Sequence, residues 1–390
     1  MSTPELLATA AGGALLAATA PGSLELLVLS AAGLLPARRP PAGRARIVAV
    51  VPAHDEEAGV ARTVTSLAAS GAALPGFEVV VVADNCADAT AARARAAGAR
   101  VLERTDLERR GKGHALGFAF DALLPEGWDG FLVVDADSVA DPGLVPAVAA
   151  WLAAGADAVQ ARYVVLNPDS APRTRLMAVA LMAFNVLRPR GRARLGLSCG
   201  IFGNGFAVGR ATVEAVPYDA HSIVEDLEYH LRLVRAGRRV RFADEAVVRG
   251  EMPVGEAAAA SQRARWEGGR LRMAGAVPGL LAGAFRRPAL LEPLLDLLTP
   301  PLGLQAALLV LAVAVPWRPG RIAAAAGLAV LAFHVAAAVR VGGGGRAELR
   351  ALAQAPRYVL WKVLRAGRIV RAARPGAEWV RTARDGEPKP

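Results

Sequence analysis

Three stretches of this chain are almost wholly apolar and long enough to cross a lipid bilayer. They cover residues 5–35, 293–317 and 321–341. Because the hydrocarbon core offers no partner to a backbone amide, a lipid-exposed stretch of about 20 apolar residues is expected to form a helix. The link at 318–320 is so short that the last two stretches predict a helical hairpin. The chain is therefore expected to be a multi-pass membrane protein.

The composition supports this expectation. Hydrophobic residues make up 54% of the 390, and the mean hydropathy is +0.33, which is high for a soluble enzyme. Lys and Arg outnumber Asp and Glu by 46 to 35, and the excess gathers beside the apolar stretches, at 36–46 and 340–374. Such flanks are typical of the cytoplasmic side, so we expect the polar part in the cytoplasm at the cell membrane. No basic region precedes the first stretch, which argues against a cleaved signal peptide. No basic stretch is interleaved with stacking aromatics, so no nucleic-acid partner is expected.

Between the apolar stretches, short β-branched runs alternate with helical patterns. The runs lie at 46–53, 77–84, 99–104, 130–137 and 157–165. This alternation predicts a mainly parallel sheet with helices on both faces. In such sheets ligands bind beyond the carboxyl ends of the strands. Acidic sets follow three of the runs, at 54–57, 84–88 and 135–137, so one edge of the sheet is expected to gather them.

Asp135 and Asp137 stand out among these acids because one residue separates them. In an extended strand, residues two apart point the same way, so both carboxylates can face one place. Three explanations fit two such close charges. Solvent separates them, one of them caps the following turn, or both face a divalent cation shared with a phosphate.

Two later features carry further polar groups. Glu225 and Asp226 stand at a predicted helix start, where the helix dipole alone would favour acids. Gln262, Arg265 and Trp266 occupy one face of another predicted helix, because they are spaced at i, i+3 and i+4. The glycines at 202–210 permit a close backbone approach to a ligand, and a simple strand and turn explains them equally well.

In chain order, these residues resemble the D, DxD, ED and QxxRW pattern of the family 2 glycosyltransferases. The branch they resemble most closely is the membrane-bound one that includes the cellulose, chitin and hyaluronan synthases. The resemblance covers 47 to about 275 and rests on Asp84, Asp135, Asp137, Glu225, Asp226, Gln262, Arg265 and Trp266. It implies the GT-A fold, an α/β architecture with a mainly parallel sheet between helices, here with transmembrane and interfacial helices added. It also implies transfer of a sugar from a nucleotide-diphosphate donor, a UDP-sugar, to a glycan or lipid-linked acceptor with inversion.

The family pattern implies a role for each matched residue. Asp137 would bind Mg²⁺ or Mn²⁺ on the donor diphosphate, and Asp135 would complete the metal site and position the donor sugar. Asp226 would be the general base that deprotonates the acceptor hydroxyl, with Glu225 beside it. Trp266 would stack on the acceptor sugar.

The remaining donor contacts are also assigned by the resemblance. They would come from Asp55, Glu56, Asp84, Gln262 and Arg265. Lys112 stands on a glycine-flanked turn where an ammonium could meet phosphate, although a solvated loop lysine is an equally good explanation.

The expected organisation follows from these assignments. It comprises an N-terminal transmembrane segment (1–37), a basic linker (38–45), a catalytic domain (46–250), interfacial helices bearing QxxRW (251–287), a transmembrane hairpin (288–341), and a basic amphipathic helix on the inner leaflet with the cytoplasmic tail (342–390). The partners expected are the donor, the acceptor and the lipid bilayer.

Two departures from the family pattern bear on function. Val224 stands where Thr or a similar residue is usual, and the chain has about three spans, fewer than the processive synthases. We therefore expect it to extend a short or lipid-linked glycan, or to work with a separate export or membrane partner protein. The alternatives are a polyprenyl-phosphate sugar synthase and a non-catalytic subunit of a polysaccharide synthesis or export complex. A nucleotidyltransferase is disfavoured, because no glycine-rich phosphate loop follows the first strand.

Overall fold

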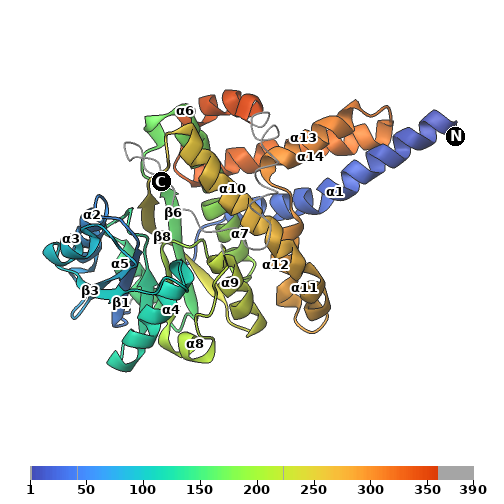
Figure 1. The fold of residues 1–390 in the computed structure, drawn as a ribbon. Helices are drawn as coiled ribbons and strands as arrows, with labels where there is room; N and C mark the ends of the chain where they lie inside the picture. The colour runs from blue at the N-terminus through green and yellow to red at the C-terminus, as the bar shows by residue number, and fades with distance from the viewer. Residues whose placement is uncertain (1, 42, 223, 359–390) are drawn as a thin grey trace.

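The protein consists of a part built on a β-sheet and a group of long helices that extend away from it (Figure 1). The computed structural model describes residues 2–41, 43–222 and 224–358. The strands are β1 (Ile47–Ala53), β2 (Glu78–Asp84), β3 (Arg100–Arg104), β4 (Gly130–Val133), β5 (Ser138–Ala140), β6 (Ala158–Val165), β7 (Phe206–Gly209) and β8 (Val240–Gly250). The α-helices are α1 (Thr3–Gly33), α2 (Val60–Gly71), α3 (Thr90–Ala96), α4 (Lys112–Leu123), α5 (Leu144–Ala153), α6 (Pro172–Leu181), α7 (Arg188–Arg194), α8 (Arg210–Ala215), α9 (Glu225–Arg235), α10 (Glu256–Arg272), α11 (Val277–Ala284), α12 (Leu291–Leu298), α13 (Leu302–Ala314), α14 (Arg318–Val341) and α15 (Arg346–Ala351).

Within the described residues the strands form one sheet in the order β3-β2-β1-β4-β7-β6-β8-β5. β1 pairs in parallel with β2 and β4, β2 with β3, and β6 with β8. The mainly parallel sheet predicted from the sequence is therefore confirmed. β7 runs antiparallel between β4 and β6, and β5 runs antiparallel to β8. β7 lies in the 202–210 stretch for which a strand and turn was one explanation, whereas β5 and β8 were not predicted from the sequence. Every antiparallel pair in the described sheet involves β5 or β7.

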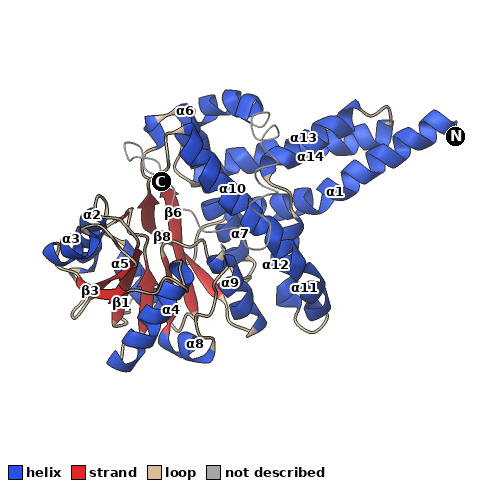
Figure 2. Cartoon of the chain, in the orientation of Figure 1, coloured by secondary structure: helices blue, strands red, loops and turns tan. Residues whose placement is uncertain are grey.

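Helices cover both faces of the sheet (Figure 2). Alternate residues of β1 point to opposite faces, as the period of a strand requires. Ile47, Ala49 and Val51 pack with apolar side chains of α2 and α5 on one face. Val48 and Val50 pack with those of α4 and α9 on the other. A strand buried on both faces has no polar alternation, which explains why β1 reads as a continuous apolar run.

α1, α13 and α14 pack together as the extended group of helices (Figure 1). Among the described residues, α1 and α14 are each long and apolar enough to cross a membrane, with mean hydropathies of 1.6 and 2.2. Leu26, Leu309, Ala324 and Leu331 form a small core between the three helices. Their outer sides remain apolar, which suits contact with lipid rather than water.

The second apolar stretch is not one straight helix. The helical segment Pro288–Leu298 meets α13 at an angle of 71°. The bend falls at Thr299, Pro300 and Pro301, because proline lacks the amide proton that a continuing helix needs. The hairpin turn lies at 315–317 rather than at 318–320, since Pro319 is accepted in the first turn of α14. Most of the range predicted to hold the basic amphipathic helix and the tail, 342–390, lies outside the described residues.

A buried network of ion pairs joins the two parts of the protein. Arg188 donates to Glu25 at 2.7 Å and to Asp296 at 2.6 Å, linking α7 to α1 and α12. Arg192 donates to Asp296 at 2.5 Å and also pairs with Glu292. Asp296 thus faces protein, as expected for an acid in an apolar stretch. The network holds α1 against the domain that carries the sheet.

Candidate active site

A large cavity lies at the carboxyl ends of β1, β2 and β4, where it also meets α6, α9 and α10. Its volume is about 1410 Å³. Of the site residues predicted from the sequence, all but Asp55 line it: Glu56, Asp84, Lys112, Asp135, Asp137, Glu225, Asp226, Gln262, Arg265 and Trp266. The fold therefore gathers on one cavity side chains that are separated by up to 210 positions, from Glu56 to Trp266.

Asp135 and Asp137 follow β4 directly and line the cavity together, as their spacing predicts. The backbone N–H of Asp135 donates to Oδ1 of Asn204 at 3.1 Å, which fixes the chain where it leaves the strand. The carboxylate of Asp135 is paired with Lys112. The hydroxyl of Ser138 donates to Asp137 at 3.4 Å. Two half-buried carboxylates on one wall supply the oxygen ligands that hard divalent cations prefer.

Glu225 and Asp226 are the first two residues of α9 and line the same cavity as the strand ends. Oδ1 of Asp226 accepts the backbone N–H of Leu227 at 2.8 Å. Its Oδ2 lies beside Gly203, where a Cβ would come within 3.3 Å of it. Burial, reinforced by the charge of Asp226, raises the pKa of Glu225 to about 7. Burial also raises the pKa of Asp226, which makes its carboxylate a better proton acceptor.

Lys112 is the first residue of α4 and connects the two acidic sets. Gly111 precedes it at φ 114°, a conformation that glycine adopts without strain. The ammonium pairs with Asp135 and donates to the carbonyl of Gly203 at 2.5 Å. Burial would lower the pKa of Lys112, but Asp135 and Glu225 outweigh burial and raise it. Lys112 is thus a charged cavity residue rather than a solvated loop lysine.

Gln262 and Arg265 lie on α10 and line the cavity. Burial lowers the pKa of Arg265, while the carboxylates of Glu225 and Asp135 act in the opposite direction. Arg265 therefore lies within electrostatic reach of both acidic sets. An arginine so placed adds fixed positive charge near the carboxylates of the β4 end.

Trp266 both lines the cavity and packs against protein. Its half-buried ring contacts the apolar cluster that contains Val165, Leu181 and Met252. The stacking role predicted for it and a packing role are therefore not exclusive, because different parts of a large ring can serve each.

The loops after β1 and β2 differ from the prediction in detail. Asp84 is buried and accepts from Arg104 at 2.6 Å. Asp55 lies outside the cavity lining, and its Oδ1 accepts the backbone N–H of Ala87 at 2.8 Å. Asp55 adopts φ 53°, a strained conformation for a residue with a Cβ, and its bond to the second loop holds it there. Of the two acids expected in the first loop, only Glu56 lines the cavity.

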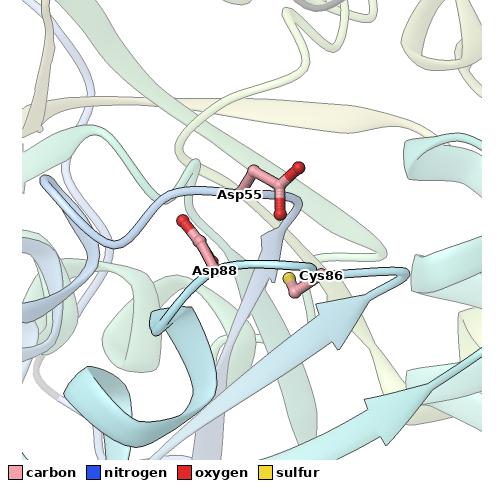
Figure 3. A group of neighbouring side chains, drawn as sticks. All are labelled: Asp55, Cys86 and Asp88. Atoms are coloured by element: carbon pink, nitrogen blue, oxygen red, sulfur yellow. The ribbon is translucent and has the colours of Figure 1, made fainter.

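Figure 3 shows Asp55, Cys86 and Asp88, whose polar atoms lie close enough to hold a metal ion. Asp88 accepts the N–H of Glu57 at 3.0 Å and that of Thr90 at 2.9 Å. Burial raises the pKa of the Cys86 thiol, whereas a metal needs the thiolate. These hydrogen bonds join the loops after β1 and β2, and we interpret the group as a structural clasp.

Two residues that hold the site residues in place, Gln160 and Asn204, were not predicted from the sequence. Gln160 is fully buried, accepts the N–H of Phe202 at 2.9 Å and donates to the carbonyl of Asn204 at 2.8 Å. Asn204 in turn holds Asp135, as described above. Both residues shape the glycine-rich loop whose Gly203 lies beside Lys112 and Asp226. The available signal was a lone Gln inside an apolar strand, since a buried amide requires hydrogen-bond partners.

Comparison with known proteins settles the family. The sequence profile described as "Glycosyltransferase like family 2" matches residues 44–269. The chain belongs to this family. It is a glycosyltransferase with the GT-A fold, and its DxD, ED and QxxRW residues all lie within the matched range.

Individual relatives are distant. The probable glycosyltransferase YdaM of Bacillus subtilis (strain 168) is 24% identical over 233 residues, which cover 57% of this chain and 55% of that protein. The chain thus spans about half the length of this curated relative. Among solved structures, the mannosyltransferase PcManGT from Pyrobaculum calidifontis, in complex with GDP-Man and Mn²⁺, is 21% identical with a TM-score of 0.53. That comparison covers 94% of this chain and 96% of the other, so the shared fold includes the helices outside the sheet domain.

Proposed function

We propose that this glycosyltransferase is anchored in the membrane and transfers a sugar, with inversion, from a nucleotide-diphosphate donor to a glycan or lipid-linked acceptor. The donor we propose is a UDP-sugar. The observation that carries the proposal is that Asp226 shares one cavity with Asp135 and Asp137. The two steps that direct displacement requires, deprotonation of the acceptor and stabilisation of the leaving diphosphate, then have residues in one cavity.

Asp226 is the general base in this proposal. Its Oδ1 is held by the backbone of α9, so Oδ2 remains to take a proton from an acceptor hydroxyl. Glu225 beside it disfavours a second negative charge, and this raises the proton affinity of the pair. Attack on the anomeric carbon forms the new glycosidic bond, breaks the bond to the diphosphate, and leaves the acceptor's proton on Asp226.

The diphosphate side of the cavity is assigned to Lys112, Gln262 and Arg265. Lys112 and Arg265 provide positive charge near the β4 end, and Gln262 lies one helical turn before Arg265. Charge that develops on the leaving phosphate is stabilised best by groups already held in place. The ammonium group of Lys112 is already held in place by its contacts with Asp135 and Gly203.

Asp137 and Asp135 fit a divalent cation, because they present carboxylate oxygens from one wall of the cavity. We propose Mg²⁺ or Mn²⁺, which when bound would neutralise charge on the donor diphosphate. The described structure gathers no third acidic, histidine or cysteine ligand around this pair. The donor's own phosphate oxygens would complete the coordination.

The membrane arrangement is part of the proposal. Arg38, Arg39 and Arg44 follow α1, so the catalytic domain would lie on the cytoplasmic side of the cell membrane. The turn between α13 and α14 would then face outward. A Pro316→Cys variant in a Cys86→Ser background tests this with an impermeant thiol reagent on intact cells. Labelling that occurs only after lysis would contradict the proposed orientation.

A donor panel tests the chemistry. The full chain in lipid nanodiscs is mixed with UDP-sugars and, because the mannosyltransferase from Pyrobaculum calidifontis was solved with GDP-Man, also with GDP-sugars. We expect nucleotide release with one donor, and more release with native membrane extract as acceptor source. Asp226→Asn serves as the inactive control. If no donor gives release above that control, the chain is not an active transferase and the non-catalytic alternative is favoured.

A further inference from the structure

The cavity extends well beyond the residues that the transfer reaction uses. We call the part of the cavity that is lined by the helices leaving the sheet domain its arm. Its far wall is formed by Leu302, Gly303 and Ala306 of α13 and by Leu331 and Val335 of α14. α14 is long and apolar enough to span a membrane, and α13 belongs to the bent pair. The catalytic cavity is therefore continuous with the surface between two helices of the membrane part.

The side wall of this arm is apolar as well. It is one continuous helical rod made of α6, a π-helical turn over Met182–Leu187, and α7. Met177, Ala180 and Phe184 of this rod line the cavity. The wider π turn is held by Asn185, whose amide donates to the carbonyl of Tyr163 at 3.1 Å. Such turns interrupt the regular ladder and are frequent at functional sites.

The bend between α12 and α13 forms the end of the arm beside α13 and α14. Thr299, Pro300 and Pro301 form the bend and line the cavity. A straight helix would have carried α13 on along the axis of α12. The two prolines prevent this, so the first turn of α13 closes the end of the arm with apolar atoms.

The charged residues beside the arm do not make it a charged channel. Arg188, Arg192 and Arg270 each pair with Asp296, and Glu25 and Glu292 complete the network. Three cations against three carboxylates give the network a formal charge of zero. The guanidinium groups are already paired with protein carboxylates. A hydrocarbon chain in the arm would therefore lie beside groups that carry no net charge.

From this geometry we infer that the arm binds the hydrocarbon chain of an amphipathic acceptor. Its hydroxyl-bearing head would reach Asp226, and its apolar chain would lie between the α6–α7 rod and α13–α14. This rests on the proposed function and narrows the acceptor to a lipid-linked one. The cavity volume of 1410 Å³ is larger than the about 300–1,000 Å³ of a pocket for one small ligand. The extra volume leaves room for an acceptor chain beside the donor.

The occupant is a hydrocarbon chain rather than a sugar polymer for a physical reason. Each hydroxyl of a glycan needs a hydrogen-bond partner once it leaves water, and an unsatisfied hydroxyl is strongly unfavourable. The end of the arm offers it Leu302, Ala306, Leu331 and Val335, which have no polar side-chain atoms. A methylene chain is instead stabilised by each CH₂ group that it buries in the same place.

Photo-cross-linking tests the location directly. The full chain in phosphatidylcholine nanodiscs is irradiated with dodecyl β-maltoside that carries a diazirine at the end of its chain. We expect adducts on the peptides that contain Ala306, Leu331 and Val335. Unlabelled dodecyl β-maltoside should remove most of the labelling, and maltose, which has the same head, should not. Adducts confined to outward residues such as Leu311 and Ile322, which are 56% and 62% exposed, would overturn the inference, and so would equal competition by maltose.

A second measurement identifies the product without knowledge of the acceptor. Membranes that contain the protein are supplied with the radiolabelled donor found in the panel, and the product is applied to a reversed-phase column. A lipid-linked product is retained, and Ala306→Trp should abolish it while leaving nucleotide affinity unchanged. Leu311→Trp, on the exposed side of the same helix, is the matched control that should retain it. A product that is not retained overturns the inference about the acceptor but is still consistent with the proposed transferase function. Loss of nucleotide binding in the parent protein would instead refute the proposed function.

Discussion

Replacement of Asp226 by Asn separates catalysis from folding more sharply than any other change at this site. The amide has the same shape, and its oxygen can still accept the N–H of Leu227 that Oδ1 accepts at 2.8 Å. It loses a negative charge at the start of α9, where a charge is worth about 0.3–1 kcal/mol. It also removes the like charge that raises the pKa of Glu225. These two effects oppose each other, so thermal stability should change little.

The effect on catalysis should be large. An amide cannot take a proton from the acceptor hydroxyl, and a positioned general base contributes about 10²–10⁴-fold. At about 1.36 kcal/mol for each factor of ten, this loss raises the barrier by about 3–5 kcal/mol. The expected result is therefore a fall in kcat by that factor with unchanged affinity for nucleotide.

Single-turnover transfer and calorimetric nucleotide titration measure both quantities on one preparation. Glu214→Gln is the matched control, because Glu214 is an exposed acid that pairs only with its helix neighbour Arg210 among the contacts described. Near-normal kcat in Asp226→Asn would show that another group accepts the proton. A large fall in the thermal midpoint, with lost nucleotide binding, would show that Asp226 is needed for folding instead.

Further outcomes follow from the same structure. Asp137→Ala should abolish metal-dependent transfer with a normal thermal midpoint, and full turnover in excess EDTA would refute the metal's role. Without metal and nucleotide, the contribution of Glu225 to stability should be fully present below about pH 4.5 and be lost as pH rises through about 7, because burial and Asp226 raise the folded-state pKa of Glu225. Thermal melts of Glu225→Gln should lack that loss. Arg192→Met should lose about 3–5 kcal/mol, since it leaves buried carboxylates unpaired, and adding Glu292→Gln should restore part of the lost midpoint. Trp266→Ala should reduce transfer more than nucleotide binding. If the variant instead lost about 3–5 kcal/mol of stability, as a fully buried Trp does, the role of Trp266 would be packing alone.

The sequence by itself determined the elements whose patterns are local. Apolar length identified α1 and α14, and continuous β-branched runs identified β1, β2, β3, β4 and β6, because the composition of each segment carries its own pattern. The ordered acidic and QxxRW residues also identified the family, since their order along the chain requires no knowledge of the fold.

Local pattern did not identify β5 and β8, and it left β7 as one of two explanations for its stretch. β7 is only Phe206–Gly209, and β8 contains Asp244, Glu245 and Arg249 among its apolar residues. Distant partners stabilise both strands. β7 pairs with β4 and β6 on its two sides, and the acid Asp244 of β8 is paired with Arg162 and Arg190. Interactions with distant residues decide such segments, and no local window records them.

Only the tertiary structure decided which of the predicted site residues act together. Asp55, in the loop after β1, and Asp84, at the end of β2, looked alike in sequence. In the structure, Asp55 accepts a hydrogen bond from the neighbouring loop, whereas Asp84 is paired with Arg104. Lys112 was ambiguous until the fold brought it against Asp135 and Gly203. The arm of the cavity that reaches α13 and α14 has no sequence signature, because its walls come from segments more than 100 positions apart that are apolar for their own packing. Local pattern fixes what a segment becomes, and the shape between segments depends on how they pack.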